Sequence, residues 1–402
     1  MINTRVFAFV VGLAVLAAGH TPKAAGQESE NIPTMKLDRI AASPAFAGQT
    51  QAPVAGPSAY IVETVASGLS TPWALAFLPD GDILVNEYSG AMRIIDRSGK
   101  VSPPLAGLPE ISTQGWAGLF DLALDPDFED NAQVYFSYTA PGAGEGAANI
   151  HRVARARLDR EGHRLTNVEV IVDGFGGQEL HFAPDGTLLV SGQGGSDGNP
   201  QDLGSATGKI LRLNRDGSMP ADNPWADAKG VQAAILTYGH RDVSGLATHP
   251  ETGELWMTEH GPRGGDELNR IIAGGNYGWK EISYGTDYNG DPVGDGSGRR
   301  YGMQQPLYFW RPSIAPSGLI FYDGALLPAW RGNAFVTSLS GQHISRLVLD
   351  GERVVGEERL LVDRAERIRE LKVGPDGALY ALTNEESDAP KGTAELLRIA
   401  PR

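Results

Sequence analysis

Residues 73–87 read WALAFLPDGDILVNE, an apolar run, a Pro-Asp-Gly turn and a second apolar run. Two short apolar segments joined by such a turn predict a β-hairpin. The same phrase recurs along the chain, and its further copies begin at Phe120, Gln178, Val243, Ser317 and Ile368. A unit that repeats in this way indicates a repeat architecture rather than a single layered domain.

A third short apolar segment follows most copies of the hairpin. These segments are AMRIIDR, HRVARARL, GKILRLN, ELNRIIA, HISRLVLD and AELLRIA. A sheet of three or four short strands cannot bury both of its faces alone, whereas stacking such sheets around an axis buries them. We therefore predict an all-β chain, a six-bladed β-propeller over residues 58–402 with long loop inserts on one face. Helix signals are scarce, and the alternative is a pair of β-sandwiches.

The N-terminal segment has the pattern of an export signal. One early arginine precedes an apolar run that ends in small residues, and this run is short for a membrane span. We predict a signal peptide over residues 1–26, with an uncleaved anchor as the alternative. A flexible leader rich in Ala, Pro and Gly is predicted over residues 27–57. The protein is thus expected in the periplasm or outside the cell, without stable membrane insertion.

Composition limits the chemistry that the chain can perform. It has 402 residues, no cysteine and a formal net charge of −15. Without cysteine no disulfide can form, and a metal must bind to oxygen or imidazole ligands. The negative charge argues against a nucleic-acid partner, because binding to phosphates requires a basic face.

Two stretches concentrate candidate functional groups. EHGPRGGDELN (259–269) combines three carboxylates with a Gly-Pro and a Gly-Gly, which suits calcium, although a solvated loop is the alternative. In RAERIRE (364–370), Arg367 and Arg369 are two residues apart and share one face of an extended segment. Two guanidinium groups on one face suit a polycarboxylate or a phosphate, and the alternative is surface pairing with neighbouring acids.

Longer phrases give a specific resemblance. They are GLFDLALDPDFEDNAQVYFSY, QDLGSATGKILRLNRDGSMPADNPW, YGHR, EHGPRGGDELN, GGNYGW, PSIAPSGLIFYDG and RIRELKVGPDGALYALT. From about Tyr60 to its end the chain resembles the soluble quinoprotein glucose/sorbosone dehydrogenases, especially their aldose sugar dehydrogenase branch. The resemblance implies a six-bladed propeller that binds pyrroloquinoline quinone (PQQ) and calcium. It also implies oxidation of the anomeric carbon of aldose sugars to lactones.

The resemblance assigns cofactor contacts residue by residue. Arg241 matches the arginine that faces the reactive quinone carbonyl and stabilises negative charge there. Asp242, beside it, stands where the family usually has asparagine. Arg367 and Arg369 match the arginines that bind the carboxylates of the cofactor, and Ser340 falls near a position where the glucose branch uses lysine.

Metal and substrate contacts follow from the same resemblance. Gly261 and Pro262 match the pair whose backbone carbonyls hold the cofactor calcium, which polarises the quinone carbonyl as a Lewis acid. Glu267 and Tyr277 match ligands of a further calcium, and Trp310 matches the aromatic residue that lines the sugar pocket.

The catalytic histidine of the family has no match in this chain. That histidine precedes a Phe-Gly-Gly turn and acts as general base, whereas Gly174, or Phe175 in a register without gaps, occupies its place here. The candidate substitutes are His181, which we take as the catalytic candidate, Glu179, Asp173 and Asp242. A glutamine of the family is replaced by Trp116, so that Gln114, two residues earlier, is the candidate substrate contact.

Three functions are compatible with these residues. The first is PQQ- and calcium-dependent oxidation of an aldose substrate with a relocated base. The second is a non-catalytic propeller that binds a sugar or a quinone-like ligand, and the third is a calcium-dependent lactonase. Because a chain without cysteine lacks a Cys-x-x-Cys-His haem motif, electrons would leave to a separate acceptor.

Overall fold

The computed structural model describes residues 42–144, 147–175, 177–192, 198–385 and 391–402. The chain divides into residues 1–36 and 37–402, and the description below concerns the second unit. The predicted signal peptide and the predicted leader as far as residue 41 lie outside the described residues.

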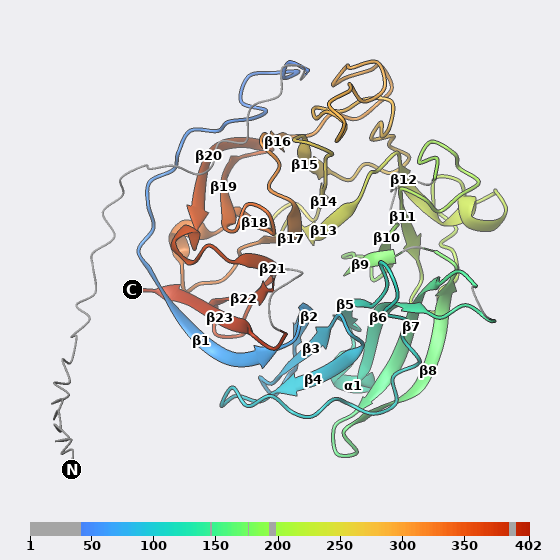
Figure 1. Ribbon diagram of the computed structural model, residues 1–402, viewed down its shortest axis with the longest axis vertical. Coiled ribbons are helices and arrows are strands. Elements are labelled where there is room, and N and C mark those ends of the chain that lie inside the picture. Colours follow the sequence, from blue (N-terminus) through green and yellow to red (C-terminus); the bar gives the residue numbers. More distant parts are fainter. Residues whose placement is uncertain (1–41, 145–146, 176, 193–197, 386–390) are drawn as a thin grey trace, which may run out of the picture. The chain divides into compact units, whose positions relative to one another are not determined.

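Six antiparallel sheets follow one another along the chain and stand around a common axis (Figure 1). This arrangement confirms the predicted all-β, six-bladed propeller. Blades 1 to 3 consist of β2 (Pro72–Phe77), β3 (Ile83–Glu87) and β4 (Ala91–Ile95); β5 (Leu119–Leu124), β6 (Gln133–Ala140), β7 (Ile150–Asp159) and β8 (Arg164–Asp173); and β9 (Gly177–Phe182), β10 (Leu188–Gly192), β11 (Lys209–Leu213) and β12 (Ile235–Tyr238).

The remaining blades are built in the same way. They consist of β13 (Val243–Thr248), β14 (Leu255–Glu259), β15 (Asp266–Arg270) and β16 (Tyr308–Trp310); β17 (Pro316–Phe321), β18 (Ala334–Ser338), β19 (Ile344–Asp350) and β20 (Arg353–Leu360); and β21 (Arg367–Val373), β22 (Leu379–Asn384), β23 (Ala394–Pro401) and β1 (Tyr60–Leu69). In blade 6 the first strand of the chain pairs with the last, which joins the two ends of the ring.

Each predicted hairpin forms the first two strands of a blade, and the first strands surround the axis. β2 contacts β5, β5 contacts β9, and the series continues through β13, β17 and β21 back to β2. All six inner strands run in the same direction. Residues near the starts of neighbouring strands contact one another, for example Ser317 and Ile368, and residues near their ends also do so, for example His181 and Thr248. We call the end of the axis at which these inner strands begin the mouth.

Apolar side chains pack between neighbouring blades, as expected for sheets that cannot bury both faces alone. Trp73, Leu119 and Phe136 belong to the cluster between blades 1 and 2. Leu75 and Leu396 belong to the cluster that joins blade 6 to blade 1. Burying apolar surface at about 25 cal/mol per Å² makes these interfaces the main source of stability, and they hold the inner strands in fixed positions.

Helices are short in the described residues. They are α1 (Phe128–Asn131) and the 3₁₀ turns η1 (Gly230–Ala234), η2 (Pro328–Trp330) and η3 (Val362–Arg364). No helix within the described ranges has the length and apolar character needed to cross a membrane. The long insert 271–307 joins β15 to β16 and returns to the mouth, where the Tyr288 hydroxyl lies 3.3 Å from Arg241 Nη2.

Residues 42–57, the described part of the predicted flexible leader, run without regular secondary structure along blades 4 and 5. Gln49 is fully buried, and its side-chain Nε2 donates a hydrogen bond to Pro306 O (2.8 Å). Further along, the Ala55 N–H donates to Glu357 O (2.9 Å). This segment therefore has fixed contacts with the propeller.

Candidate functional site

Several predicted site residues gather at the mouth. Arg241 lies two residues before β13. Arg367 and Arg369 are the first and third residues of β21. Gly261 and Pro262 lie between β14 and β15, and β14 runs antiparallel to β13, so their turn returns to the same end. The strand order of the blades thus brings distant motifs of the sequence to one face.

Arg369 presents a positive charge with unused hydrogen-bonding capacity. Its Cζ lies 3.9 Å from the centroid of the Trp73 ring, a cation–π contact. Among the described residues, its buried Nε has no hydrogen-bond partner. Burial, followed by the repulsion of nearby Arg367, lowers the pKa of Arg369 to about 10. Two neighbouring guanidinium groups that disfavour each other's charge are suited to an anionic ligand.

Arg241 is held by its main chain and by aromatic rings. The Arg241 N–H donates to Glu259 Oε2 (2.9 Å), and its Cζ lies 5.5 Å from the centroid of the Trp279 ring. Its Nη2 donates to the Tyr288 hydroxyl at 3.3 Å. Trp279 belongs to the GGNYGW motif, so this motif and Glu259 together fix the position of the arginine.

Asp242 is close enough to both Arg241 and Arg369 to interact with their charges. Burial raises the pKa of its carboxyl group, while His260, Arg241 and Arg369 lower it through their positive charge. Its Oδ1 is buried and has no hydrogen-bond partner among the residues described. Because one carboxylate interacts with both Arg241 and Arg369, the two arginines border the same part of the mouth.

The Gly261–Pro262 turn is organised by a buried carboxylate, Asp266. Its two oxygens accept hydrogen bonds from Gly261 N (2.7 Å), Ser313 Oγ (2.6 Å), Ile314 N (2.6 Å) and Ala315 N (2.8 Å). A Cβ on Gly261 would lie 2.3 Å from Gly264 O, so only glycine fits. No described backbone N–H donates to the carbonyl oxygens of Gly261 or Pro262.

Of the three carboxylates of residues 259–269, Glu259 and Glu267 are opposite each other on β14 and β15, whereas Asp266 is hydrogen-bonded to Gly261 and to residues 313–315. Asp266 and Glu259 are committed to the contacts given above, while Glu267 accepts a hydrogen bond from Asn269 Nδ2 (3.0 Å). Burial, followed by the charge of Glu259, raises the pKa of Glu267. The Tyr277 hydroxyl donates to the Arg270 carbonyl (2.5 Å). Within the described ranges, no three His, Asp or Glu side chains come together as metal ligands.

His181 lies away from the arginines. Its Nε2 is 2.7 Å from Thr248 Oγ1, at the ends of β9 and β13 opposite the mouth. It lies four positions after Gly177, the start of β9, or about 13 Å away at the usual rise of a strand. Burial lowers the pKa of His181 to about 4. The structure therefore does not place His181 where the base is needed, and we do not assign it proton transfer.

The predicted substrate contacts have different surroundings. Trp310 lies in the outermost strand of blade 4 and is 2% exposed, with its Nε1 3.3 Å from Glu357 Oε1. This buried position does not bring it to the arginines. Gln114 and Ser340 are exposed at the mouth, in the loop before β5 and in the β18–β19 turn. Their contacts with a ligand stay a prediction.

An aromatic group at the mouth was missed by sequence reasoning. Trp116 is 57% exposed, and its ring centroid lies 6.1 Å from those of Trp73 and Tyr88. The two inner rings are stacked at 5.1 Å, and Arg369 covers Trp73. The signal in the sequence was Trp116 itself, which stands in place of the family's glutamine. Its exposure, however, depends on packing between blades 1 and 2.

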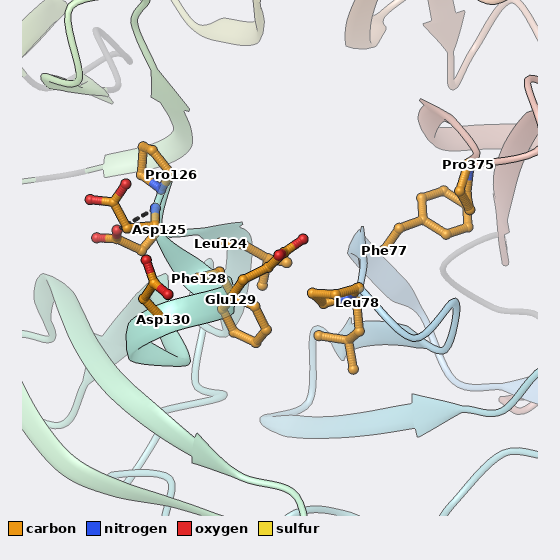
Figure 2. Close-up of a pocket in the computed structure, with 11 residues that line it drawn as sticks. Phe77, Leu78, Leu124, Asp125, Pro126, Phe128, Glu129, Asp130 and Pro375 are labelled. Carbon is orange, nitrogen blue, oxygen red and sulfur yellow. Dashed lines mark hydrogen bonds between the residues drawn. The ribbon is translucent and has the colours of Figure 1, made fainter.

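A separate hollow lies at the opposite end of the axis (Figure 2). It is lined by Phe77 and Leu78 of blade 1, by Leu124 and Phe128 of blade 2, and by Pro375 of blade 6. These residues lie at or beyond the ends of the inner strands. Carboxylates but no arginine or lysine line it, so it lacks the features of the mouth.

The fold and site define a class of protein: a six-bladed propeller with Arg241, Arg367, Arg369 and the Gly261–Pro262 turn at one end of its axis. Residues 69–397 match the family model described as Glucose / Sorbosone dehydrogenase. The chain therefore belongs to the glucose/sorbosone dehydrogenase family, as its motifs predicted.

Named relatives are similar over most of their length. The aldose sugar dehydrogenase YliI of Escherichia coli is 35% identical, over 87% of this chain and 95% of that protein. A solved glucose dehydrogenase is 40% identical with a TM-score of 0.78, covering 84% of this chain and 99% of the other. The PQQ-bound aldose sugar dehydrogenase of Streptomyces coelicolor is 28% identical with a TM-score of 0.71, covering 86% and 99%.

Proposed function

We propose that the protein oxidises aldose sugars to lactones, with PQQ and calcium bound at the mouth. The observation that carries this proposal is the pair of arginines around the mouth, with a buried donor of Arg369 left without a described partner. The named relatives support it, since they include an aldose sugar dehydrogenase and a PQQ-bound structure.

The residues of the mouth fit a flat, multiply negative cofactor. Arg367 and Arg369 would hold its carboxylates, and Trp73 supports Arg369 from behind at 3.9 Å. An added anion would relieve the mutual repulsion that lowers the pKa of Arg369. Ser340, exposed on the neighbouring turn, would supply a further polar contact.

The Gly261–Pro262 turn fits the cofactor calcium. Calcium prefers oxygen ligands, and these two carbonyls receive no hydrogen bond from a described N–H. Glu267 and Tyr277 would hold the further calcium, since a cation beside Glu267 would offset the burial and the repulsion from Glu259 that raise its pKa. Both metal positions are part of the proposal.

When bound, the quinone accepts a hydride from the anomeric carbon of the sugar. Arg241 would place a fixed positive donor where negative charge develops in that step. Asp242 works against it, because a carboxylate beside the same arginine reduces the local positive potential. Exposed Trp116 would pack against the sugar ring, with Gln114 two residues away at the rim.

One assay tests the proposal against the two alternatives. The purified protein is mixed with calcium and PQQ, and reduction of an electron-accepting dye is followed with a panel of aldoses. Turnover that depends on PQQ is expected, with a separate acceptor taking the electrons. A thermal shift on adding PQQ without turnover would indicate the non-catalytic binding protein, and hydrolysis of a lactone without PQQ would indicate the lactonase.

A pair of matched variants tests the site itself. Arg369→Gln should weaken PQQ binding by at least about tenfold, because one charge-assisted contact contributes more than about 1.4 kcal/mol. Arg359→Gln, on the outer strand β20, is the control and should bind as the parent does. Equal PQQ affinity in both variants would contradict the assignment.

A further inference from the structure

His151 is a histidine that stands next to the position where the family places its base. The Gly174 N–H donates to His151 O (2.9 Å), and the next pair along the two strands is Arg152 opposite Asp173. Side chains of opposed residues on antiparallel strands emerge about 5 Å apart. Apart from Gly174 and its two chain neighbours, no atom of the described residues lies within 4 Å of where a Cβ on Gly174 would stand.

The ring of His151 is directed toward the aromatic group of the mouth. It stacks on the Phe120 ring at the start of inner strand β5, with 6.1 Å between centroids and planes 20° apart. Phe120 in turn lies 5.2 Å from Trp73, the ring that Arg369 covers. One chain of ring contacts therefore joins His151 to the arginine that would bind the cofactor.

The imidazole is in a state that can accept a proton. Burial lowers the pKa of His151, which keeps the ring neutral at neutral pH. Its Nδ1 lies 3.4 Å from Thr139 Oγ1 on β6, and on β5 it faces Phe120. The charged groups beside it on β7 and β8, Arg152 and Asp173, pair with each other at 2.7 Å. Among the described residues, Nε2 has no hydrogen-bond partner.

We propose that His151 is the general base of this chain and replaces the histidine that the family carries at the position of Gly174. The inference rests on the proposed function. The anomeric hydroxyl proton passes to Nε2 of His151, and the hydrogen on the same carbon leaves with its electron pair for the quinone. The carbon–oxygen bond becomes the carbonyl of the lactone, so two electrons and both hydrogens are accounted for.

Asp173, His181 and Asp242 are less suited to this step. Asp173 is already paired with Arg152, and His181 lies at the far end of its strand. Asp242 is close to Arg241 and Arg369, and their positive charge disfavours its protonated form. His151 alone of these four combines a neutral ring with a place beside Gly174.

The kinetic test compares His151→Gln and His151→Asn with His181→Gln, in protein loaded with calcium and PQQ. Both His151 variants should lose at least about 100-fold in kcat, the usual effect of removing a positioned base. In the parent, kcat/KM should fall at acidic pH as the base is protonated, and this fall should be absent from both His151 variants. PQQ should still produce the same thermal shift in these variants as in the parent. His181→Gln should stay within threefold of the parent.

A second readout does not depend on turnover. With ¹⁵N-labelled histidine, addition of glucono-lactone to the loaded protein should shift the ring signal that is missing from His151→Gln. Turnover by the His151 variants within threefold of the parent, or a ring signal unmoved by bound lactone, would overturn the proposal. A parent without PQQ-dependent turnover would instead overturn the proposed function itself.

Discussion

The substitution Asp266→Asn tests whether one buried carboxylate organises the calcium-binding turn. Each carboxylate oxygen accepts two hydrogen bonds, Oδ1 from Gly261 N and Ser313 Oγ, and Oδ2 from Ile314 N and Ala315 N. An asparagine can keep its oxygen at the Ile314–Ala315 pair and donate from its amino group to the Ser313 hydroxyl, which can accept as well as donate, but the Gly261 N–H then loses its acceptor. One hydrogen bond to a charged group is lost, so the free energy of unfolding should fall by about 1.5–3 kcal/mol.

Urea unfolding at neutral pH measures this loss. The urea midpoint should fall while the dependence of the unfolding free energy on urea concentration stays constant. This result would show that the substitution changes stability and not the compactness of the folded or unfolded state. Asp216→Asn is the matched control, because both bonds to this exposed side chain, from Ser218 N and Oγ, reach the same oxygen. That control should stay within about 0.5 kcal/mol of the parent. A loss below about 1 kcal/mol in Asp266→Asn would refute the argument.

Three further outcomes are expected. Gly261→Ala should lower the affinity for calcium, measured by calorimetry, at least about tenfold, because the new Cβ would lie 2.3 Å from Gly264 O. Gly56→Ala, which has open space around it, is the control. Equal calcium affinities of the two variants would contradict the argument that only glycine fits the turn. Asp242→Asn should tighten PQQ binding in a titration, because it removes a negative charge beside Arg241; weaker binding would count against this. Because the pKa of His181 falls to about 4 from 6.5, its contribution to stability is present above pH 6.5 and lost as pH falls toward 4. The urea midpoint of His181→Gln should therefore drop less than that of the parent between pH 6.5 and 4. An equal drop in the two proteins would contradict this role of His181.

The blades were predictable because their signals are local. The hairpin phrase and the third apolar segment lie within a few residues of one another, and they mark β2 to β4 and their counterparts. Arg367 and Arg369 were also predictable, since they lie at the start of the last copy of the phrase and so at the start of an inner strand. Their meeting with Arg241 followed once the number of blades was known.

Residues whose role depends on contacts between blades were not accessible in this way. The resemblance predicted that Trp310 lines the sugar pocket, yet Trp310 is buried and its Nε1 donates to Glu357 of the next blade. The carboxylates of residues 259–269 suggested one metal site, although Asp266 turns to a loop 47 to 49 residues further on. Sequence spacing does not show which of two faces a side chain takes when a turn intervenes.

The contrast between the arginines and the base has a physical explanation. A cofactor with several fixed negative groups needs positive groups at set positions, so Arg241, Arg367 and Arg369 cannot move without loss of binding. A general base needs only to reach one proton, and an imidazole can do so from either of two opposed strands. Because Gly174 and His151 are opposed through a 2.9 Å hydrogen bond, the base can change strands while the cofactor stays in place. The absence of a histidine at position 174 is therefore compatible with a working dehydrogenase when the neighbouring strand supplies the proton acceptor.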